Sequence, residues 1–137
     1  MYLLDTNIWL ENILEQEKHD EVKKFLTTID DNKLYISRFS FYSIGLHLFF
    51  KNKKEAFLSF VNDLFLEGSV NLISLNPHDM NELIINSRKY NLTFDDSYQY
   101  TCAKKNNLIL VSFDVDFDKS DIKRLTPIRI LHSKELK

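Results

Sequence analysis

Two aspartates, Asp5 and Asp114, each follow a short apolar run that is typical of a buried strand. The first run is 2–4 and the second is 108–113. In an open α/β sheet, ligands bind outside the carboxyl ends of the strands, near the point where the strand order reverses. Carboxylates that converge there repel each other, so a site that keeps them charged usually holds a metal ion. The sequence therefore predicts one acidic site built from both ends of the chain.

Two further aspartates are candidates for the same site. Asp116 lies in the loop after the second run, and Asp96 opens an expected helix whose N-terminal end must point at the same cleft. Hard carboxylate oxygens suit Mg²⁺ or Mn²⁺, which keep several waters and accept phosphate oxygens. Such an ion lowers the pKa of its bound water and neutralises charge on a phosphodiester, while an acid can act through water as a general base.

Each aspartate also has a purely structural interpretation. Asp5 is suited to cap a helix, an interaction worth about 1 kcal/mol. Asp96, or its neighbour Asp95, could do the same, and aspartate is common in turns such as 114–116. Independent caps, however, need not converge on one end of a sheet. The four histidines show no metal-ligand spacing, and no glycine-rich phosphate loop is present, so no other catalytic set competes.

The elements that must position these residues alternate along the chain. Strands are expected at 2–4, 34–36, 70–74, 108–111 and, as a last edge strand, 127–131. Helices are expected directly after Asp5 and over 18–29, 54–67, 76–90 and 96–105, with Gly68 as a left-handed residue after the third. This succession predicts an α/β fold: a three-layer α/β/α sandwich with a mostly parallel central sheet. Without repeats or linkers, residues 1–137 are expected to form a single domain.

The segment 38–50 is rich in aromatic side chains: Phe39, Phe41, Tyr42, Phe49 and Phe50. Such a stripe is more often core or subunit interface than a platform for stacking bases.

Composition bounds the class of protein. The chain has 137 residues, of which 44% are hydrophobic, and only two glycines and two prolines, as in a helix-rich globular domain. A net charge of −2 neither demands nor excludes a nucleic-acid partner. The single cysteine, Cys102, rules out an internal disulfide and favours a reducing compartment. Asp5 interrupts the apolar N-terminus, and no window approaches the roughly 18 apolar residues of a membrane span. We expect a cytoplasmic protein with no membrane partner.

Several of these residues form a longer pattern with their neighbours. It comprises Leu3-Leu4-Asp5-Thr6-Asn7, Asp96 seven residues before Ala103, and Leu110-Val111-Ser112-Phe113-Asp114 followed by Asp116-Phe117. This pattern resembles the PIN-domain ribonucleases, many of which are VapC-like toxins of bacterial toxin–antitoxin pairs. The resemblance covers most of the chain and implies a PIN-like three-layer α/β/α domain. It also implies a Mg²⁺- or Mn²⁺-dependent endoribonuclease, the toxin of a type II pair, which hydrolyses RNA phosphodiester bonds.

The resemblance assigns roles to individual residues. It makes Asp5, Asp96 and Asp114 catalytic residues and metal ligands, and Asp116 an accessory catalytic acid. It matches Thr6 and Ser112 to hydroxyl positions that often hold a carboxylate or a metal-bound water. It further implies a cognate antitoxin protein as a partner, and a homodimer.

One position departs from the family pattern. The family usually places a glutamate early in the helix after the second strand, and the corresponding residue here is Ser43, which carries no charge. No acid lies between Asp31 and Glu55 to replace it, and Glu11 is expected to point away along its helix. The alternative is therefore a catalytically weakened PIN-like domain that acts as a protein- or RNA-binding module. A nuclease directed at DNA or at structured nucleic acid would share the same acids.

An RNA substrate requires cations near the acidic segments. The candidates nearest in sequence are Arg38, Lys104, Lys105, Lys119, Lys123 and Arg124. A solvated charged face explains these residues equally well. If they bind RNA, affinity should fall steeply with salt as counterions are released.

Overall fold

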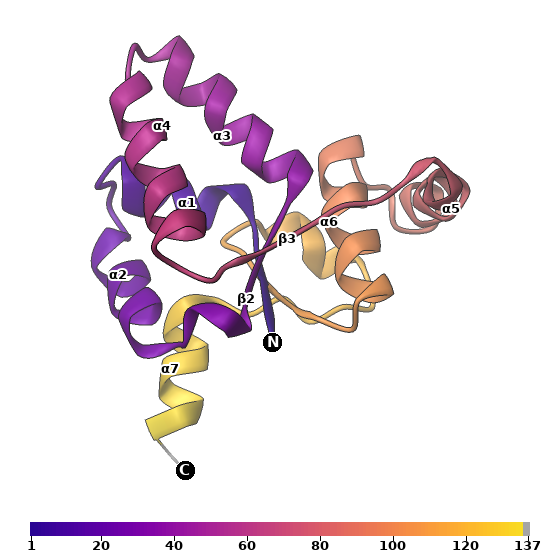
Figure 1. Ribbon diagram of the computed structural model, residues 1–137. Helices are drawn as coiled ribbons and strands as arrows, with labels where there is room; N and C mark the ends of the chain where they lie inside the picture. Colours follow the sequence, from indigo (N-terminus) through magenta and orange to yellow (C-terminus); the bar gives the residue numbers. More distant parts are fainter. Residues whose placement is uncertain (136–137) are drawn as a thin grey trace.

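The computed structural model describes residues 1–135, and in it a four-stranded sheet lies between two groups of helices (Figure 1). The strands are β1 (Tyr2–Leu4), β2 (Leu34–Ser37), β3 (Asn71–Ile73) and β4 (Ile109–Val111). Every pairing between them is parallel, in the order β3-β2-β1-β4. The three-layer α/β/α architecture expected from the sequence is confirmed. The last two residues of the predicted 1–137 domain lie outside the described residues.

The helices divide between the two faces of the sheet. On one face lie α1 (Thr6–Ile13), α2 (His19–Thr28), α3 (Arg38–Phe50), α4 (Lys54–Val61) and α7 (Pro127–Glu135). On the other face lie α5 (Met80–Tyr90) and α6 (Phe94–Lys105). The structure also contains short 3₁₀-helices, η1 (Asp31–Lys33), η3 (Pro77–Asp79) and η4 (Val115–Lys119), and one π-helix, η2 (Asn62–Leu66). In the part of the chain that the structure describes, no helix combines the length and apolar character that crossing a membrane requires.

Two separate hydrophobic cores hold these layers together. Leu4 and Val111 belong to the core under α1 to α4, whereas Leu3 and Leu110 belong to the core under α6. Successive side chains on a strand point to opposite faces of the sheet, so even a three-residue strand supplies both cores. Apolar runs without polar alternation are therefore what a sheet covered on both faces requires.

The strand order creates a crevice beside β1. The chain leaves β1 to build β2 and β3 on one side, and returns to place β4 on the other side. The backbone N–H of Asp5 donates to the Val111 carbonyl at 2.9 Å, which joins the two carboxyl ends. This is the reversal of strand order at which α/β sheets bind ligands.

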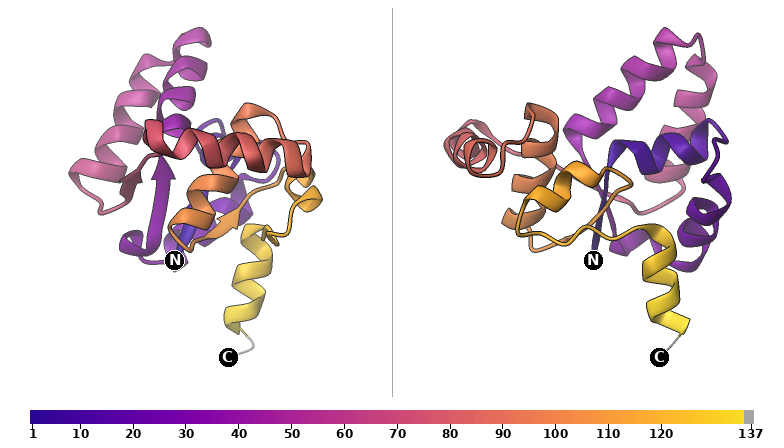
Figure 2. Two further views of the ribbon diagram at one scale, coloured as in Figure 1. Left: turned by 90° about the vertical axis from the view of Figure 1, so that its right-hand side faces the viewer. Right: turned by 180° about the vertical axis from the view of Figure 1, so that it is seen from behind.

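The expected edge strand at 127–131 is wrong, because this segment forms helix α7, which packs against α2 (Figure 2). Pro127 occupies the first helical position, where its missing N–H and fixed φ suit a helix start. The Ile128 N–H donates to the Glu21 carboxylate on α2 at 3.0 Å, and Ile130 and Leu131 are buried. Before this helix, Leu125 forms an isolated parallel bridge with Val111 of β4.

The expected left-handed conformation of Gly68 is also wrong, since no described glycine has positive φ. Helix α4 ends at Val61 and continues as the π-helical turn η2. A Cβ at Gly68 would lie 2.4 Å from the Asp63 carbonyl oxygen and 2.8 Å from Asp31 Oδ2. Glycine is needed there for close approach, while the left-handed residues of the described chain are all other than glycine, such as Asn91, which ends α5.

The aromatic segment becomes α3 and has two faces. Ile44 and Leu48 are buried, and the Phe41 ring packs against Phe57 at 5.6 Å between centroids, so the inner face is core as expected. On the outer face, Leu46 is 74% exposed and Phe50 is 90% exposed. The expected interface role of this face stays a prediction.

Candidate functional site

A cleft of about 240 Å³ lies at the carboxyl ends of β1 and β4. Asp5, Asp96 and Asp114 all line it, although they are far apart in sequence. Its other lining residues are Thr6, Asn7, Leu10, Phe39, Ser43, Asp95 and Gln99. Parallel strands thus deliver Asp5 and Asp114 to one edge, and the first turn of α6 delivers Asp96 to the same place.

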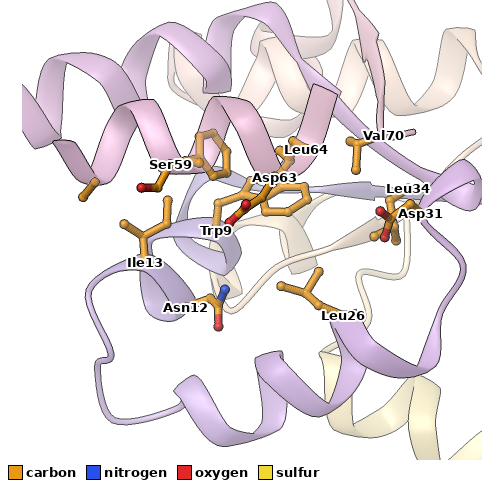
Figure 3. A pocket seen from close by; sticks show the side chains of 12 residues that line it. Trp9, Asn12, Ile13, Leu26, Asp31, Leu34, Ser59, Asp63, Leu64 and Val70 are labelled. Carbon is orange, nitrogen blue, oxygen red and sulfur yellow. The ribbon is translucent and has the colours of Figure 1, made fainter. Parts of the chain in front are cut away.

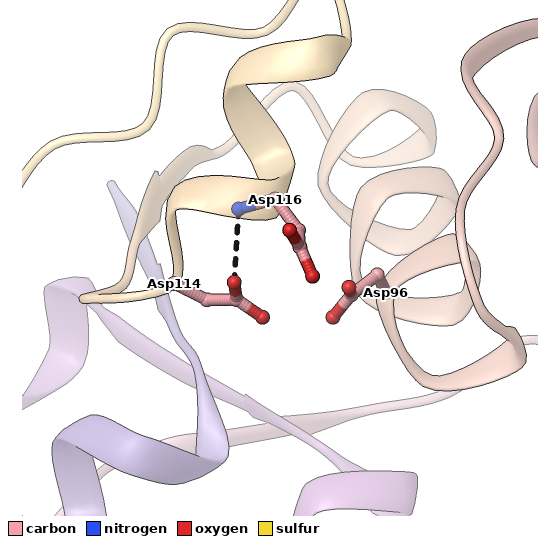
Figure 4. Close-up of side chains that lie close together, drawn as sticks. All are labelled: Asp96, Asp114 and Asp116. Carbon is pink, nitrogen blue, oxygen red and sulfur yellow. Dashed lines mark hydrogen bonds between the residues drawn. The ribbon is translucent and has the colours of Figure 1, made fainter.

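The loop after β4 orients two of the acids. Asp114 is the N-cap of η4, and its Oδ1 accepts from the Asp116 backbone N–H at 2.9 Å. The Ser112 hydroxyl oxygen accepts from the Asp114 backbone N–H at 2.9 Å, which tightens the same turn. The structural interpretation of Asp114 therefore holds, and the same turn directs the Asp114 and Asp116 carboxylates toward Asp96 (Figure 4).

Three carboxylates form a group that could hold a metal ion. One oxygen from each of Asp96, Asp114 and Asp116 lies within 4.8 Å of the others (Figure 4). Opposite ligands of an octahedral Mg²⁺ are about 4 Å apart, so small side-chain movements would bring this group to ligand distance. The Asp116 side chain is 50% exposed, and Lys119 Nζ lies 3.8 Å from its Oδ1. Oxygen donors of this kind fit Mg²⁺ or Mn²⁺ rather than softer ions.

The pKa of Asp96 depends on three other acids at this end of the sheet. Helix α6 begins two residues earlier than expected, with Thr93 as its N-cap, so that Asp96 is its third residue. Asp96 is only 9% exposed. Burial and the charges of Asp114, Asp5 and Asp116 together raise the pKa of Asp96 to about 6, and burial is the largest cause. The four aspartates therefore share one electrostatic environment.

Asp5 is held differently from the other three acids. Its Oδ1 accepts from the Thr6 backbone N–H at 2.8 Å and from Gln99 Nε2 at 3.0 Å. Its Oδ2 accepts from the Ser112 hydroxyl at 2.7 Å and from Asn7 Nδ2 at 3.3 Å. Burial raises the pKa of Asp5, whereas the hydrogen bonds from Gln99, Ser112 and Thr6 oppose this rise. A carboxylate accepts about four hydrogen bonds, so the hydrogen-bonding capacity of Asp5 is filled. Asp5 is also the N-cap of α1 and forms part of the inner wall of the cleft.

Residues that the sequence analysis missed complete this wall. Gln99 also donates to the Ser40 hydroxyl oxygen at 2.8 Å and accepts from the Ser37 hydroxyl at 2.7 Å. A signal was available, because residues three apart on a helix share a face, and Gln99 follows Asp96 by that spacing. Of the two hydroxyl positions expected from the resemblance, Ser112 contacts Asp5, and Thr6 Oγ1 lies 2.8 Å from Ser40 Oγ.

Ser43 lines the cleft, so the position of the expected glutamate faces the acids without carrying charge. Glu11 is not among the residues that line the cleft. Its Oε2 is buried and has no hydrogen-bond partner among the described residues. Glu11 therefore does not replace the missing carboxylate.

Most of the basic candidates are already paired with acids. Lys104 lies 3.3 Å from Asp121, Lys105 lies 2.8 Å from Asp79, and Arg124 lies 3.2 Å from Asp118. Arg38 donates to the Tyr42 hydroxyl at 3.4 Å, and Lys123 is exposed. Of these residues, Lys119 is the one paired with an acid of the group, and its ion pair with Asp116 is solvent-exposed.

Other hollows lie away from the acidic group. An apolar pocket of about 390 Å³ is enclosed by α1, α2, α4 and η2, with Trp9, Leu26 and Leu64 in its walls (Figure 3). Two carboxylates, Asp31 and Asp63, line it as well. A hollow of about 480 Å³ between α5 and α6 is lined by Lys104, Lys105 and their acidic partners.

Comparisons with known proteins agree on one fold. A family model described as the PIN domain matches residues 2–123. Among solved structures, a toxin–antitoxin complex from Klebsiella pneumoniae has a TM-score of 0.72 and 18% identity, covering 93% of this chain and 98% of that one. FitAcB from Neisseria gonorrhoeae has a TM-score of 0.74 and 18% identity, covering 93% and 99%. VapC20 of Mycobacterium tuberculosis, described as a sarcin-ricin loop cleaving toxin, has a TM-score of 0.76 and 14% identity, covering 93% and 100%. A search of curated proteins found no match.

Proposed function

The chain belongs to the PIN domain family, and we propose that it is a Mg²⁺- or Mn²⁺-dependent endoribonuclease, the toxin of a type II toxin–antitoxin pair. One observation carries the proposal. Asp96, Asp114 and Asp116 present oxygens within 4.8 Å of one another, beside Asp5, at the crevice where α/β sheets bind ligands. Clustered acids with a raised pKa are more typical of functional sites than of helix caps alone.

The four acids take distinct parts in this proposal. Of the three expected ligands, Asp96 and Asp114 belong to the group that would contact the ion, and the geometry adds Asp116 to it. Asp5 lies outside this group and already accepts four hydrogen bonds. When bound, the ion supplies a water of lowered pKa and neutralises charge on the phosphodiester. Asp116 is the most exposed of the group, and there it can accept a proton from water at the mouth of the cleft. Asp5 presents fixed negative charge from the inner wall.

RNA is the proposed substrate. The similarity in fold to a toxin described as cleaving the sarcin-ricin loop supports RNA over DNA. Lys119 stands beside the acidic group and is the first candidate for a phosphate contact. Because such contacts release counterions, binding should weaken as salt rises.

Cleavage assays test the proposal directly. Purified protein is incubated with single-stranded RNA, and in parallel with DNA of the same sequence, with Mn²⁺ and with EDTA. We expect Mn²⁺-dependent cleavage of RNA that is abolished in Asp96→Asn. Cleavage in EDTA, or wild-type activity in Asp96→Asn, would reject the acidic group as the active site. Preferred cleavage of DNA would show that the substrate is DNA and not RNA.

A binding module is the second candidate, and Ser43 favours it. The cleft lacks a carboxylate at this position, and Asp5 has little capacity left for a metal ion. Thermal unfolding separates the two, because a ligand that binds only the folded state must raise Tm. The nuclease predicts a Mn²⁺-dependent rise that is lost in Asp96→Asn, whereas a module without a metal site predicts none.

The partners follow from the same proposal. An antitoxin protein is supported by the similarity to toxin–antitoxin complexes. The apolar pocket beside Trp9, with Asp31 and Asp63 in its lining, suits an apolar anchor flanked by a basic residue of such a partner (Figure 3).

A homodimer is proposed through the exposed outer face of α3. A cytoplasmic location is proposed because the substrate is RNA.

A further inference from the structure

We infer that Gln99 is a positioning residue of the acidic site, whose side-chain amide holds Asp5 in place and thereby sets the strength of divalent-cation binding in the cleft. The inference rests on the proposed function, because it concerns the same site. It assigns a role to a side chain that no metal-ligand or catalytic pattern selects.

The three hydrogen bonds of Gln99 define its orientation. The side chain is 2% exposed, and its Nε2 donates to Asp5 Oδ1 at 3.0 Å and to Ser40 Oγ at 2.8 Å. Its Oε1 accepts from the Ser37 hydroxyl at 2.7 Å. An ionised carboxylate only accepts hydrogen bonds, so the amide nitrogen must face Asp5. With three partners, the amide cannot rotate without losing bonds.

The network connects the cleft to the segment that lacks the acid. Ser37 ends β2 and caps α3 by accepting from the Ser40 backbone N–H at 3.0 Å. Ser40 lies one helical turn before Ser43, which lines the cleft without charge. The hydroxyls of Ser37 and Ser40 therefore fix the Gln99 amide. The amide in turn orients the carboxylate of Asp5.

The consequence for a bound ion follows from how carboxylates are held. Groups that hydrogen-bond to the acids of a metal site orient them, and their loss typically costs about 10- to 100-fold in metal affinity or activity. Without Gln99, Asp5 Oδ1 keeps only the Thr6 backbone N–H as a donor. The carboxylate would still be held at Oδ2 by Ser112 and Asn7, but it would oppose the repulsion from Asp96 and Asp114 with one donor fewer.

Calorimetric titration of the protein and its variants with Mn²⁺ tests the role of Gln99. Gln99→Met keeps the length of the side chain and removes both the donor and the acceptor, and we expect about tenfold weaker Mn²⁺ binding. Asn86→Leu is the matched control, because Asn86 is also a buried amide that donates to a hydroxyl, that of Thr101, at 3.0 Å. This control lies on α5 and does not line the cleft. We expect it to lower stability in denaturant and to leave the Mn²⁺ Kd unchanged.

A double-mutant cycle shows whether Gln99 acts through Asp5. In an Asp5→Asn background, adding Gln99→Met should change the Mn²⁺ Kd by less than about twofold, since the residue it orients no longer carries charge. If Gln99→Met does not fold, Ser40→Ala replaces it, because this small change removes one partner of the amide together with the contact between Ser40 Oγ and Thr6 Oγ1. We expect it to weaken Mn²⁺ binding about threefold, a fraction of the loss of the amide itself.

The outcomes separate this inference from the proposed function. Wild-type affinity in Gln99→Met, or in its replacement Ser40→Ala, overturns the inference and leaves the nuclease intact. The same holds for an equal loss in Asn86→Leu, or for a full tenfold loss in the Asp5→Asn background. Failure of the wild-type protein to bind Mn²⁺ overturns the proposed function, and this inference with it.

Discussion

Ser112 and Asp5 join the two ends of the chain, since the Ser112 hydroxyl donates to Asp5 Oδ2 at 2.7 Å across 107 positions of sequence. The same hydroxyl oxygen accepts from the Asp114 backbone N–H at 2.9 Å. One buried side chain therefore fixes the inner acid and the start of the acidic loop together. The site is rigid at this point, so changes in its charge should appear in metal binding and stability rather than in loss of the fold.

Neutralising Asp96 should have opposite effects on stability and on metal binding. Asp96→Asn removes a negative charge that lies close to Asp114 and Asp116, and the relief of repulsion should raise the Tm of the metal-free protein. A gain of about 1 kcal/mol corresponds to a rise of about 3 °C for a domain of this size. The Mn²⁺-dependent rise in Tm should disappear. Scanning calorimetry with and without Mn²⁺ measures both, and a variant that keeps the Mn²⁺ shift would contradict the assignment of Asp96.

The metal-free protein should become more stable as pH falls from 7 to 5. Asp96 has a pKa of about 6 in the folded protein but 3.8 as its ordinary value, so the folded state binds more protons in this window. Its contribution to stability is complete below pH 3.8 and is lost as pH rises through 6, and the raised pKa of Asp5 acts in the same direction. As pH falls from 7 to 5, the Tm of Asp96→Asn should rise less than the Tm of the wild type. A flat difference between the two proteins would argue against the raised pKa.

Restoring the missing acid should strengthen metal binding. Ser43→Glu adds a carboxylate to the cleft that Asp96 and Asp114 line, and we expect about tenfold tighter Mn²⁺ binding, or about 1.4 kcal/mol. Repulsion should simultaneously lower the Tm of the metal-free protein. Ser43→Gln is the control of equal size, and it should leave the Mn²⁺ Kd near that of the wild type. Equal affinities for the two variants would mean that this position does not reach the ion.

The two glycines should differ in how well they tolerate alanine. Gly68→Ala would place a Cβ 2.4 Å from the Asp63 carbonyl oxygen, which is backbone, and we expect a loss of about 2 kcal/mol or more. Gly45→Ala lies in α3 and meets only the tip of the Phe57 ring at 3.2 Å. There the gain in helix propensity, about 1 kcal/mol, should offset the movement of the ring. Denaturant unfolding compares the two, and a harmless Gly68→Ala would show that the turn yields easily.

Charge on the outer face of α3 should dissociate the proposed dimer. Leu46→Lys and Phe50→Lys replace apolar side chains that are 74% and 90% exposed with positive charges. Apolar side chains that are exposed together on one face mark a protein interface. Sedimentation velocity should show a shift toward monomer. Ile128→Lys changes an exposed apolar residue on α7 and should leave the mass unchanged. A wild-type protein that is already monomeric would exclude this interface.

Local sequence determined the strands and the positions of two acids. Apolar runs such as 2–4 and 109–111 need burial on both faces, and a chain that alternates such runs with helices can meet this need in a parallel sheet. Parallel strands end at one edge, so Asp5 and Asp114 had to lie near each other once β1 and β4 became neighbours. For these residues, the apolar run that determines their place at the end of a strand lies within a few positions of the residue itself.

Tertiary structure alone decided the rest, because the deciding partners are distant in sequence. The segment 127–131 could form a strand or a helix by its own pattern, and the Glu21 carboxylate and the face of α2 selected the helix. Asp116 joined the group of clustered carboxylates because η4 turned its carboxylate toward Asp96. Gln99, one of the four donors to Asp5, lies 94 positions away, and no pattern in the sequence around Asp5 carries that information.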